Sequence, residues 1–154
     1  MNLNFPLLIK GPLAVIGNIS NEDQLSYLNE KQVDKYGFKN VTFIDSSGYE
    51  YKILSFDKKN LSNLPFKKFL KIVFKNFGGH YLDSKKNKGV WVEFNLSPPK
   101  KRNLDEIKKE LTELFLNNPK WFKNSDFSQT QAIELFINEA RTVKELIKNI
   151  SVWS

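Results

Sequence analysis

The chain has 154 residues, and its 24 Lys and Arg residues outnumber 17 Asp and Glu residues to give a net charge of +7. With no cysteine and one histidine, the sequence excludes disulfides, thiolate zinc sites and cysteine nucleophiles, and it leaves little imidazole chemistry. Because no apolar run approaches the ~18 residues of a membrane helix and residues 1–15 lack a signal-peptide pattern, we expect one cytoplasmic domain over residues 1–154 that does not engage a membrane.

The first half of the chain predicts short extended segments, one short helix and a hairpin. Residues 3–16 contain prolines and predict an edge strand or two short extended pieces. A helix-start pattern at Ser20 predicts a short helix near residues 21–30. Apolar positions alternate over residues 41–53 on either side of a turn at Gly48, which predicts a β-hairpin. Its second strand carries apolar residues of both parities and is therefore expected to be central.

The second half predicts mainly helices. Residues 66–77 place apolar side chains at i, i+3, i+4, i+7, i+8 and i+11, which predicts an amphipathic helix. Residues 78–89 are polar and predict an exposed loop, and alternation over residues 90–95 predicts a strand. Asn103 is the expected N-cap of a helix that Pro119 ends.

Two further helix starts follow near the end of the chain. Ser128 with Gln131, and Thr142 with Glu145, have the spacing of capping boxes, and nothing between the two helices forces a break. The order of elements predicts an α+β fold. We expect a small, mostly antiparallel sheet, made of the hairpin and further strands, packed by the central amphipathic helix and by the C-terminal helices.

The positive charge is concentrated in the middle of the chain. Residues 58–102 carry twelve basic and two acidic residues, whereas residues 1–57 and 103–154 have net charges of −2 and −1. A block of this kind is typical of a surface that meets an acidic partner. The residues predicted to contact that partner are seven lysines and two aromatic residues of the block: Lys67, Lys68, Lys71, Lys75, Lys85, Lys86, Lys88, Tyr81 and Trp91.

Nonspecific nucleic-acid binding through residues 58–102 is the alternative interpretation. Eleven of the twelve basic residues are Lys, a hydrated point charge, whereas recognition of base edges favours Arg. Nonspecific binding would instead stack bases on Tyr81 and Trp91. A third interpretation is that the lysines form a solvated helix face without a partner.

The sequence gives little indication of a catalytic site. His80 lies in the predicted loop near Asp83, without the spacing of a known acid-base site, and no hydrolase, phosphate-loop or dinucleotide motif is present. Carboxylates that could meet across a sheet, as an acid-base pair or cation site, are Asp45, Glu50, Asp57 and Glu93. The simpler interpretation is that Asp45 is a turn residue and that Glu93 lies on the polar face of a strand. We expect no catalytic residue, no metal and no cofactor.

A small, cysteine-free α+β domain without catalytic motifs is similar in size and organisation to bacterial immunity proteins. That resemblance implies a non-catalytic domain that binds and neutralises another protein, here one with an acidic surface. Inhibitors that imitate nucleic acid present acidic charge, whereas the block at residues 58–102 is basic. The partner therefore either carries an acidic patch or meets the slightly acidic segments 1–57 and 103–154. The oligomeric state is not indicated by the sequence.

Overall fold

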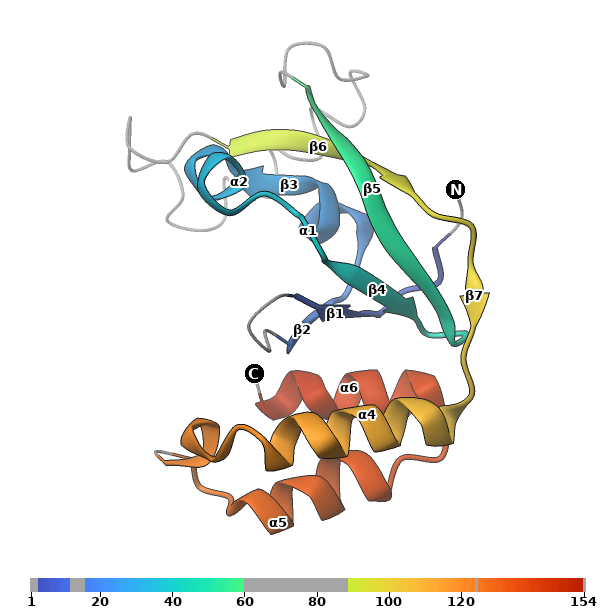
Figure 1. The fold of residues 1–154 in the computed structure, drawn as a ribbon, viewed down its shortest axis with the longest axis vertical. Coiled ribbons are helices and arrows are strands. Elements are labelled where there is room, and N and C mark those ends of the chain that lie inside the picture. Colours follow the sequence, from blue (N-terminus) through green and yellow to red (C-terminus); the bar gives the residue numbers. More distant parts are fainter. Residues whose placement is uncertain (1–2, 12–15, 60–88, 124, 154) are drawn as a thin grey trace.

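The structure is a computed structural model that describes residues 3–11, 16–59, 89–123 and 125–153. It shows a curled antiparallel sheet with a layer of C-terminal helices beneath it (Figure 1). The predicted α+β class, the mostly antiparallel sheet and the C-terminal helices are confirmed. The helix predicted at residues 66–77, and the predicted loop up to residue 88, lie outside the described residues.

The sheet is built from short strands around one long strand. In chain order the strands are β1 (Leu7–Lys10), β2 (Ile16–Ile19), β3 (Tyr27–Asn29), β4 (Thr42–Asp45), β5 (Tyr49–Lys59), β6 (Gly89–Leu96) and β7 (Lys100–Lys101). Their spatial order is β2-β1-β4-β5-β6-β3, with β7 beside the start of β5, and the pairs described are all antiparallel.

The first strand is interior, which corrects the expected edge position. β1 pairs with β2 on one side and with β4 on the other. Pro6, which has no N–H to donate, stands just before β1 and so removes no hydrogen bond from the ladder. The edge is formed by β2, the second of the two extended pieces.

The predicted hairpin is confirmed. β4 pairs with β5 so that Phe43 lies opposite Tyr51, and β5 is interior, between β4 and β6. The side chain of Leu54 in β5 is nevertheless 61% exposed. It lies where the register between β5 and β6 shifts, between Ile53 and Ser55, and an extra residue at such an irregularity is left out of the pairing.

The hairpin turn depends on Gly48, whose φ is +81° and whose N–H donates to the Asp45 carbonyl oxygen at 2.8 Å. A Cβ at this position would lie 3.0 Å from the Arg102 carbonyl oxygen. We expect Gly48→Ala to lower the free energy of unfolding by about 1 to 3 kcal/mol, measured by urea denaturation. The matched control is Gly17→Ala, because within the described residues, its two chain neighbours aside, no atom lies within 4 Å of the added Cβ. Equal losses in the two variants would contradict the strained turn.

The predicted helix at residues 21–30 is shorter than expected and is interrupted by a strand. α1 (Glu22–Ser26) gives way to β3, whose residues pair with β6, and α2 (Glu30–Tyr36) follows. The helix starts one residue later than predicted: the Gln24 N–H donates to Asn21 Oδ1 at 3.1 Å, and the Ser20 N–H donates to Gln24 Oε1 at 2.7 Å.

The C-terminal layer contains α4 (Leu104–Leu116), a 3-10 turn (Pro119–Phe122), α5 (Gln129–Ala132), a π-helical segment (Ile133–Asn138) and α6 (Val143–Trp153). The N-cap at Asn103 and the capping box at Ser128 are confirmed. The last two helices do not run together. The preceding segment ends at Asn138, and at the start of α6 the Glu145 N–H donates to Thr142 Oγ1 at 3.1 Å while the Arg141 N–H donates to Glu145 Oε2 at 2.8 Å.

Apolar side chains project from both faces of the sheet. Leu7 and Leu8 are both fully buried and, as neighbours on a strand, point to opposite faces. Leu8 and Ile44 pack against the helical layer, whereas Leu7 and Phe43 belong to a second cluster on the other face. The concave side of the curled sheet therefore has its own core, separate from that of the helices.

Candidate functional site

Trp91 is the predicted contact residue that falls within the described part of the chain. It lies in β6 opposite Tyr27 of β3, and its side chain is 2% exposed. A ring buried to this extent does not present a face on which a base could stack. The other predicted contact residues lie outside the described residues, as does His80: Lys67, Lys68, Lys71, Lys75, Lys85, Lys86, Lys88 and Tyr81.

Four of the five described basic residues of the block make side-chain contacts within the chain. Lys58 forms an ion pair with Asp34, and Lys59 pairs with Glu93 at 2.5 Å. Lys101 donates to the Ser47 carbonyl oxygen at 2.5 Å. Arg102, the only arginine of the block, binds three carboxylates. These four side chains direct their positive charge towards the protein's own groups.

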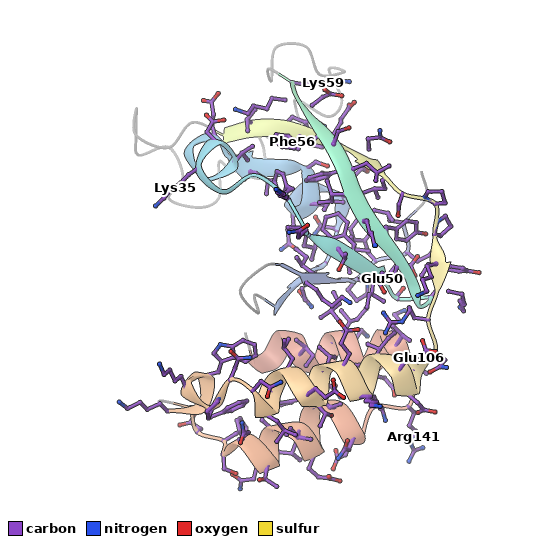
Figure 2. All side chains as sticks on the ribbon, viewed as in Figure 1. Lys35, Glu50, Phe56, Lys59, Glu106 and Arg141 are labelled. Carbon is purple, nitrogen blue, oxygen red and sulfur yellow. The ribbon has the colours of Figure 1, made fainter. Side chains whose placement is uncertain are left out.

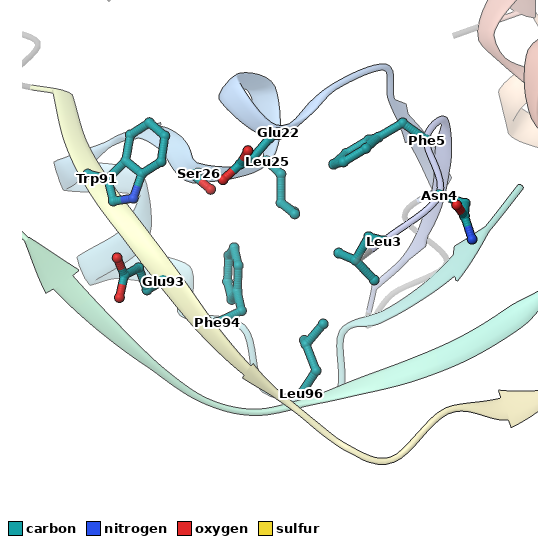
Figure 3. Close-up of a pocket in the computed structure, with 10 residues that line it drawn as sticks. All are labelled: Leu3, Asn4, Phe5, Glu22, Leu25, Ser26, Trp91, Glu93, Phe94 and Leu96. Carbon is teal, nitrogen blue, oxygen red and sulfur yellow. The ribbon is translucent and has the colours of Figure 1, made fainter. Parts of the chain in front are cut away.

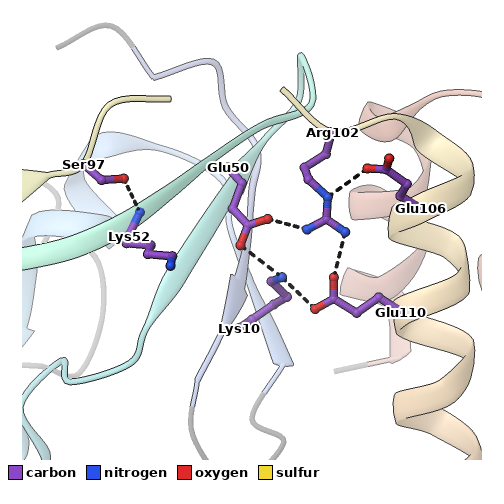
Figure 4. Close-up of polar contacts among 7 residues, drawn as sticks. All are labelled: Lys10, Glu50, Lys52, Ser97, Arg102, Glu106 and Glu110. Carbon is purple, nitrogen blue, oxygen red and sulfur yellow. Dashed lines mark hydrogen bonds and ion pairs between the residues drawn. The ribbon is translucent and has the colours of Figure 1, made fainter. Parts of the chain in front are cut away.

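A network of five charged side chains joins the sheet to α4 (Figure 4). Arg102 binds Glu50 of β5 and, at 3.1 Å each, Glu106 and Glu110 of α4. Lys10 of β1 lies 2.7 Å from Glu110 and 3.5 Å from Glu50. We call this group the interlayer ion network.

The pKa values of Arg102 and Glu110 reflect their ion pairs within the interlayer ion network. Burial lowers the pKa of Arg102, but hydrogen bonds to Glu50, Glu110 and Glu106 outweigh it and raise the pKa. Burial raises the pKa of Glu110, but Lys10 and Arg102 outweigh it and hold the pKa below its ordinary value. Arg102 and Glu110 are thus both stabilised in their charged forms. This suits a structural link between the sheet and α4 rather than proton transfer.

Of the remaining candidate carboxylates, Asp45 lies in the hairpin turn, whereas Asp57 and Glu93 lie together on β5 and β6. Asp45 is fully buried and accepts the N–H groups of Ser47 and Tyr49 at 3.0 and 2.9 Å, which is the predicted role in the turn. Burial and the Asp45 carboxylate raise the pKa of Tyr51. Asp57 and Glu93 are exposed and lie opposite each other across β5 and β6. Within the described ranges, no group of three or more His, Asp or Glu side chains could hold a metal ion.

A pocket of about 700 Å³ lies on the concave side of the sheet (Figure 3). We call it the concave pocket. Three segments far apart in the sequence line it: the start of the chain, helix α1 and strand β6. Its lining residues are Leu3, Asn4, Phe5, Glu22, Leu25, Ser26, Trp91, Glu93, Phe94 and Leu96.

The lining of the concave pocket combines aromatic and aliphatic side chains with polar ones. Phe94 is held by edge contacts to Phe38 and Phe43, with ring centroids 4.8 and 5.7 Å away. The lining's charged groups in the described chain are the carboxylates of Glu22 and Glu93. A hollow that combines aromatic walls with polar groups can accept a ligand or an anchoring side chain.

Comparison with known proteins gave no matching family model, no matching curated protein and no matching solved structure. None of the helices in the described ranges combines the length and apolar character needed to span a bilayer.

Proposed function

We propose that the protein is a non-catalytic domain of the bacterial immunity type, which binds and neutralises another protein in the cytoplasm. The observation that supports this proposal is the concave pocket, because a preformed hollow with aromatic walls suits an anchoring side chain from a protein partner. A chain without cysteine needs no oxidising compartment to fold, which supports the cytoplasmic assignment.

The charges of the described residues help to choose the surface that a partner contacts. Lys58, Lys59 and Arg102 of the basic block already bind carboxylates of this chain. The concave pocket, by contrast, is lined largely by the slightly acidic segment 1–57. We therefore place the main contact at the concave pocket. Contact between an acidic surface and the lysines outside the described residues is proposed as a second, separate contribution.

Recovery of the partner tests the proposal. We expect the tagged full chain, purified from its native cell at about 50 mM salt, to retain one protein in stoichiometric amount, and the two purified components to re-form a 1:1 complex. Salt screens the attraction between charges and has little effect on the burial of an apolar anchor. The complex should therefore persist at higher salt. Recovery of the chain as a clean monomer at low salt would contradict the proposal.

The same purification distinguishes nucleic-acid binding from protein binding. If the lysine-rich block binds phosphates, nucleic acid should copurify, and its affinity for duplex DNA should fall with salt with a logarithmic slope of about −0.9 for each phosphate contacted. Copurified nucleic acid without a protein partner would replace protein binding by this second function. Absence of oligonucleotide binding at about 50 mM salt would remove the alternative, because attraction between charges is strongest there.

A further inference from the structure

One edge of β5 is only partly occupied in the described chain. β4 pairs with this edge up to Lys52, and the Ile53 N–H donates to the Val41 carbonyl oxygen at 3.2 Å. Residues 37–40, which precede β4, lie outside the sheet. Along residues 54–59 β5 pairs with β6 on its other edge, and no described strand lies beside this one. We call this stretch the open edge of β5.

The open edge presents backbone groups that can pair with another strand. Figure 2 shows Glu50 where β4 lies alongside β5, whereas Phe56 and Lys59 lie in the part of β5 beyond it. Every second residue of a strand directs its N–H and C=O groups to the same edge, so the stretch offers about three such residues. Exposed groups of this kind are a template for strand addition.

A hollow of about 500 Å³ lies beside the open edge, at the point where β4 ends. It is lined by residues 37–40 and 53–56, and we call it the edge pocket. Leu54 contributes a side chain that is 61% exposed, and the rings of Phe38 and Phe56 meet edge-on with centroids 5.0 Å apart. A strand that continued the line of β4 would therefore pass along apolar side chains.

The edge pocket also has a positive charge. Lys39 is the ionisable residue of its lining, and this exposed side chain forms no ion pair or hydrogen bond with the rest of the described chain. The carboxylate next along β5 belongs to Asp57, which follows Phe56 and so points to the opposite face of the sheet. Positive charge beside hydrocarbon favours a segment that combines an acidic residue with apolar ones.

We propose that the open edge of β5 binds an extended segment of a partner protein, which joins the sheet as a further strand. Backbone hydrogen bonds to residues 54–59 supply affinity. Apolar side chains of the segment that pack on Phe38 and Leu54, and an Asp or Glu beside Lys39, supply specificity. This inference goes beyond the proposed function, because it assigns a surface other than the concave pocket and a different kind of partner segment.

Short capped peptides test the inference directly. Amide chemical shifts of the full chain are followed by NMR during titration with three peptides. The first is acetyl-Thr-Val-Glu-Val-Thr-amide, the second has Lys in place of Glu, and the third is the Glu peptide N-methylated at its three central residues, which removes their N–H donors.

We expect the Glu peptide to shift amides of residues 37–41 and 53–59, and to bind about tenfold more tightly than its N-methylated form. Its expected preference over the Lys peptide is about threefold at low salt, because an exposed charge pair contributes little. Equal binding of the Glu peptide and its N-methylated form would overturn the proposal. Shifts confined to residues 3–5 and 22–26, in the concave pocket, would do the same.

Variants of the edge pocket separate charge from apolar contact. Lys39→Gln should make the Glu and Lys peptides bind equally, whereas Leu54→Ala should weaken both. Both side chains are exposed, so the variants should fold, which thermal unfolding checks. The matched controls are Lys144→Gln, in α6, and Leu135→Ala, in the π-helical segment, and both should bind as the unmodified chain does. A charge preference that survives Lys39→Gln would contradict the role of Lys39.

A second copy of the chain is the competing occupant of the open edge. Analytical ultracentrifugation of the chain alone should show a monomer, and a dimer that Leu54→Ala dissociates would overturn the inference in favour of self-association. If a partner is recovered, its undiminished binding to the double variant Lys39→Gln, Leu54→Ala would rule out the inference and leave the proposed function intact. Peptide binding at the open edge without any recovered partner would support the inference and contradict the proposed function.

Discussion

Phe115→Ala is expected to lower the free energy of unfolding by about 3 to 5 kcal/mol. Phe115 is fully buried in the core of the helical layer. Its ring makes an edge contact with Trp121 at 6.0 Å and a tilted contact with Phe122 at 5.4 Å, between centroids. Truncation would therefore remove both ring contacts and leave a cavity between α4 and the 3-10 turn. Urea denaturation followed by circular dichroism gives the free energy of unfolding.

The neighbouring residue provides the control for this change. Leu116 is also at the end of α4, but its side chain is 55% exposed, so Leu116→Ala should cost at most about 0.5 kcal/mol. A similar cost for the two substitutions would contradict the packing of the helical layer.

Arg102→Ala is expected to destabilise the protein by about 3 kcal/mol, because it breaks the centre of the interlayer ion network. The side chains of Arg102 and Glu50 are only 15% and 13% exposed. Removal of the guanidinium leaves Glu50 and Glu110 with Lys10 as their shared cation. The change in the free energy of unfolding is measured by urea denaturation at neutral pH.

Two controls distinguish the network from the loss of a single surface charge. Arg102→Lys retains the charge but loses the fork that reaches three carboxylates, so an intermediate loss is expected. Glu106→Gln removes a carboxylate that is 52% exposed and should cost less than about 1 kcal/mol. A loss in Arg102→Ala no larger than in Glu106→Gln would contradict the network.

The effect of Arg102→Ala should also depend on pH. The pKa of Glu110 is lower in the folded protein than its ordinary value of 4.5, so its pairing contributes stability above that value. This contribution is lost as the pH falls through the folded pKa. The difference in stability between the unmodified chain and Arg102→Ala should therefore shrink in acid.

Features encoded within a few consecutive residues could be predicted from the sequence. The turn at Gly48 and the helix starts at Asn103 and Ser128 depend on side chains that bond backbone groups within three or four residues. β3 was missed because Leu25 and Leu28 have helical spacing. Pairing with β6, sixty or more residues away in sequence, prevails over that local pattern.

The candidate site depends on contacts that no local spacing reveals. The lining of the concave pocket comes from three separate segments, and strand alternation predicted that Trp91 would face away from Val90 and Val92. Trp91 does alternate with them, but the first part of β6 is covered on both faces, so all three side chains are buried. Likewise, a charge count over residues 58–102 could not show that Arg102 is paired with Glu50, because this carboxylate belongs to another segment.

The helical layer has a consequence for the order of folding. Except for Leu8 and Ile44, the buried residues of its core come from residues 107–150, so most of its contacts join neighbouring parts of the chain. The sheet instead requires β1 to find β4, and β5 to find β6 across the intervening residues 60–88. Contacts between distant segments incur a larger loop-closure entropy and form more slowly. Residues 107–150 are therefore the part of the chain that we expect to organise first.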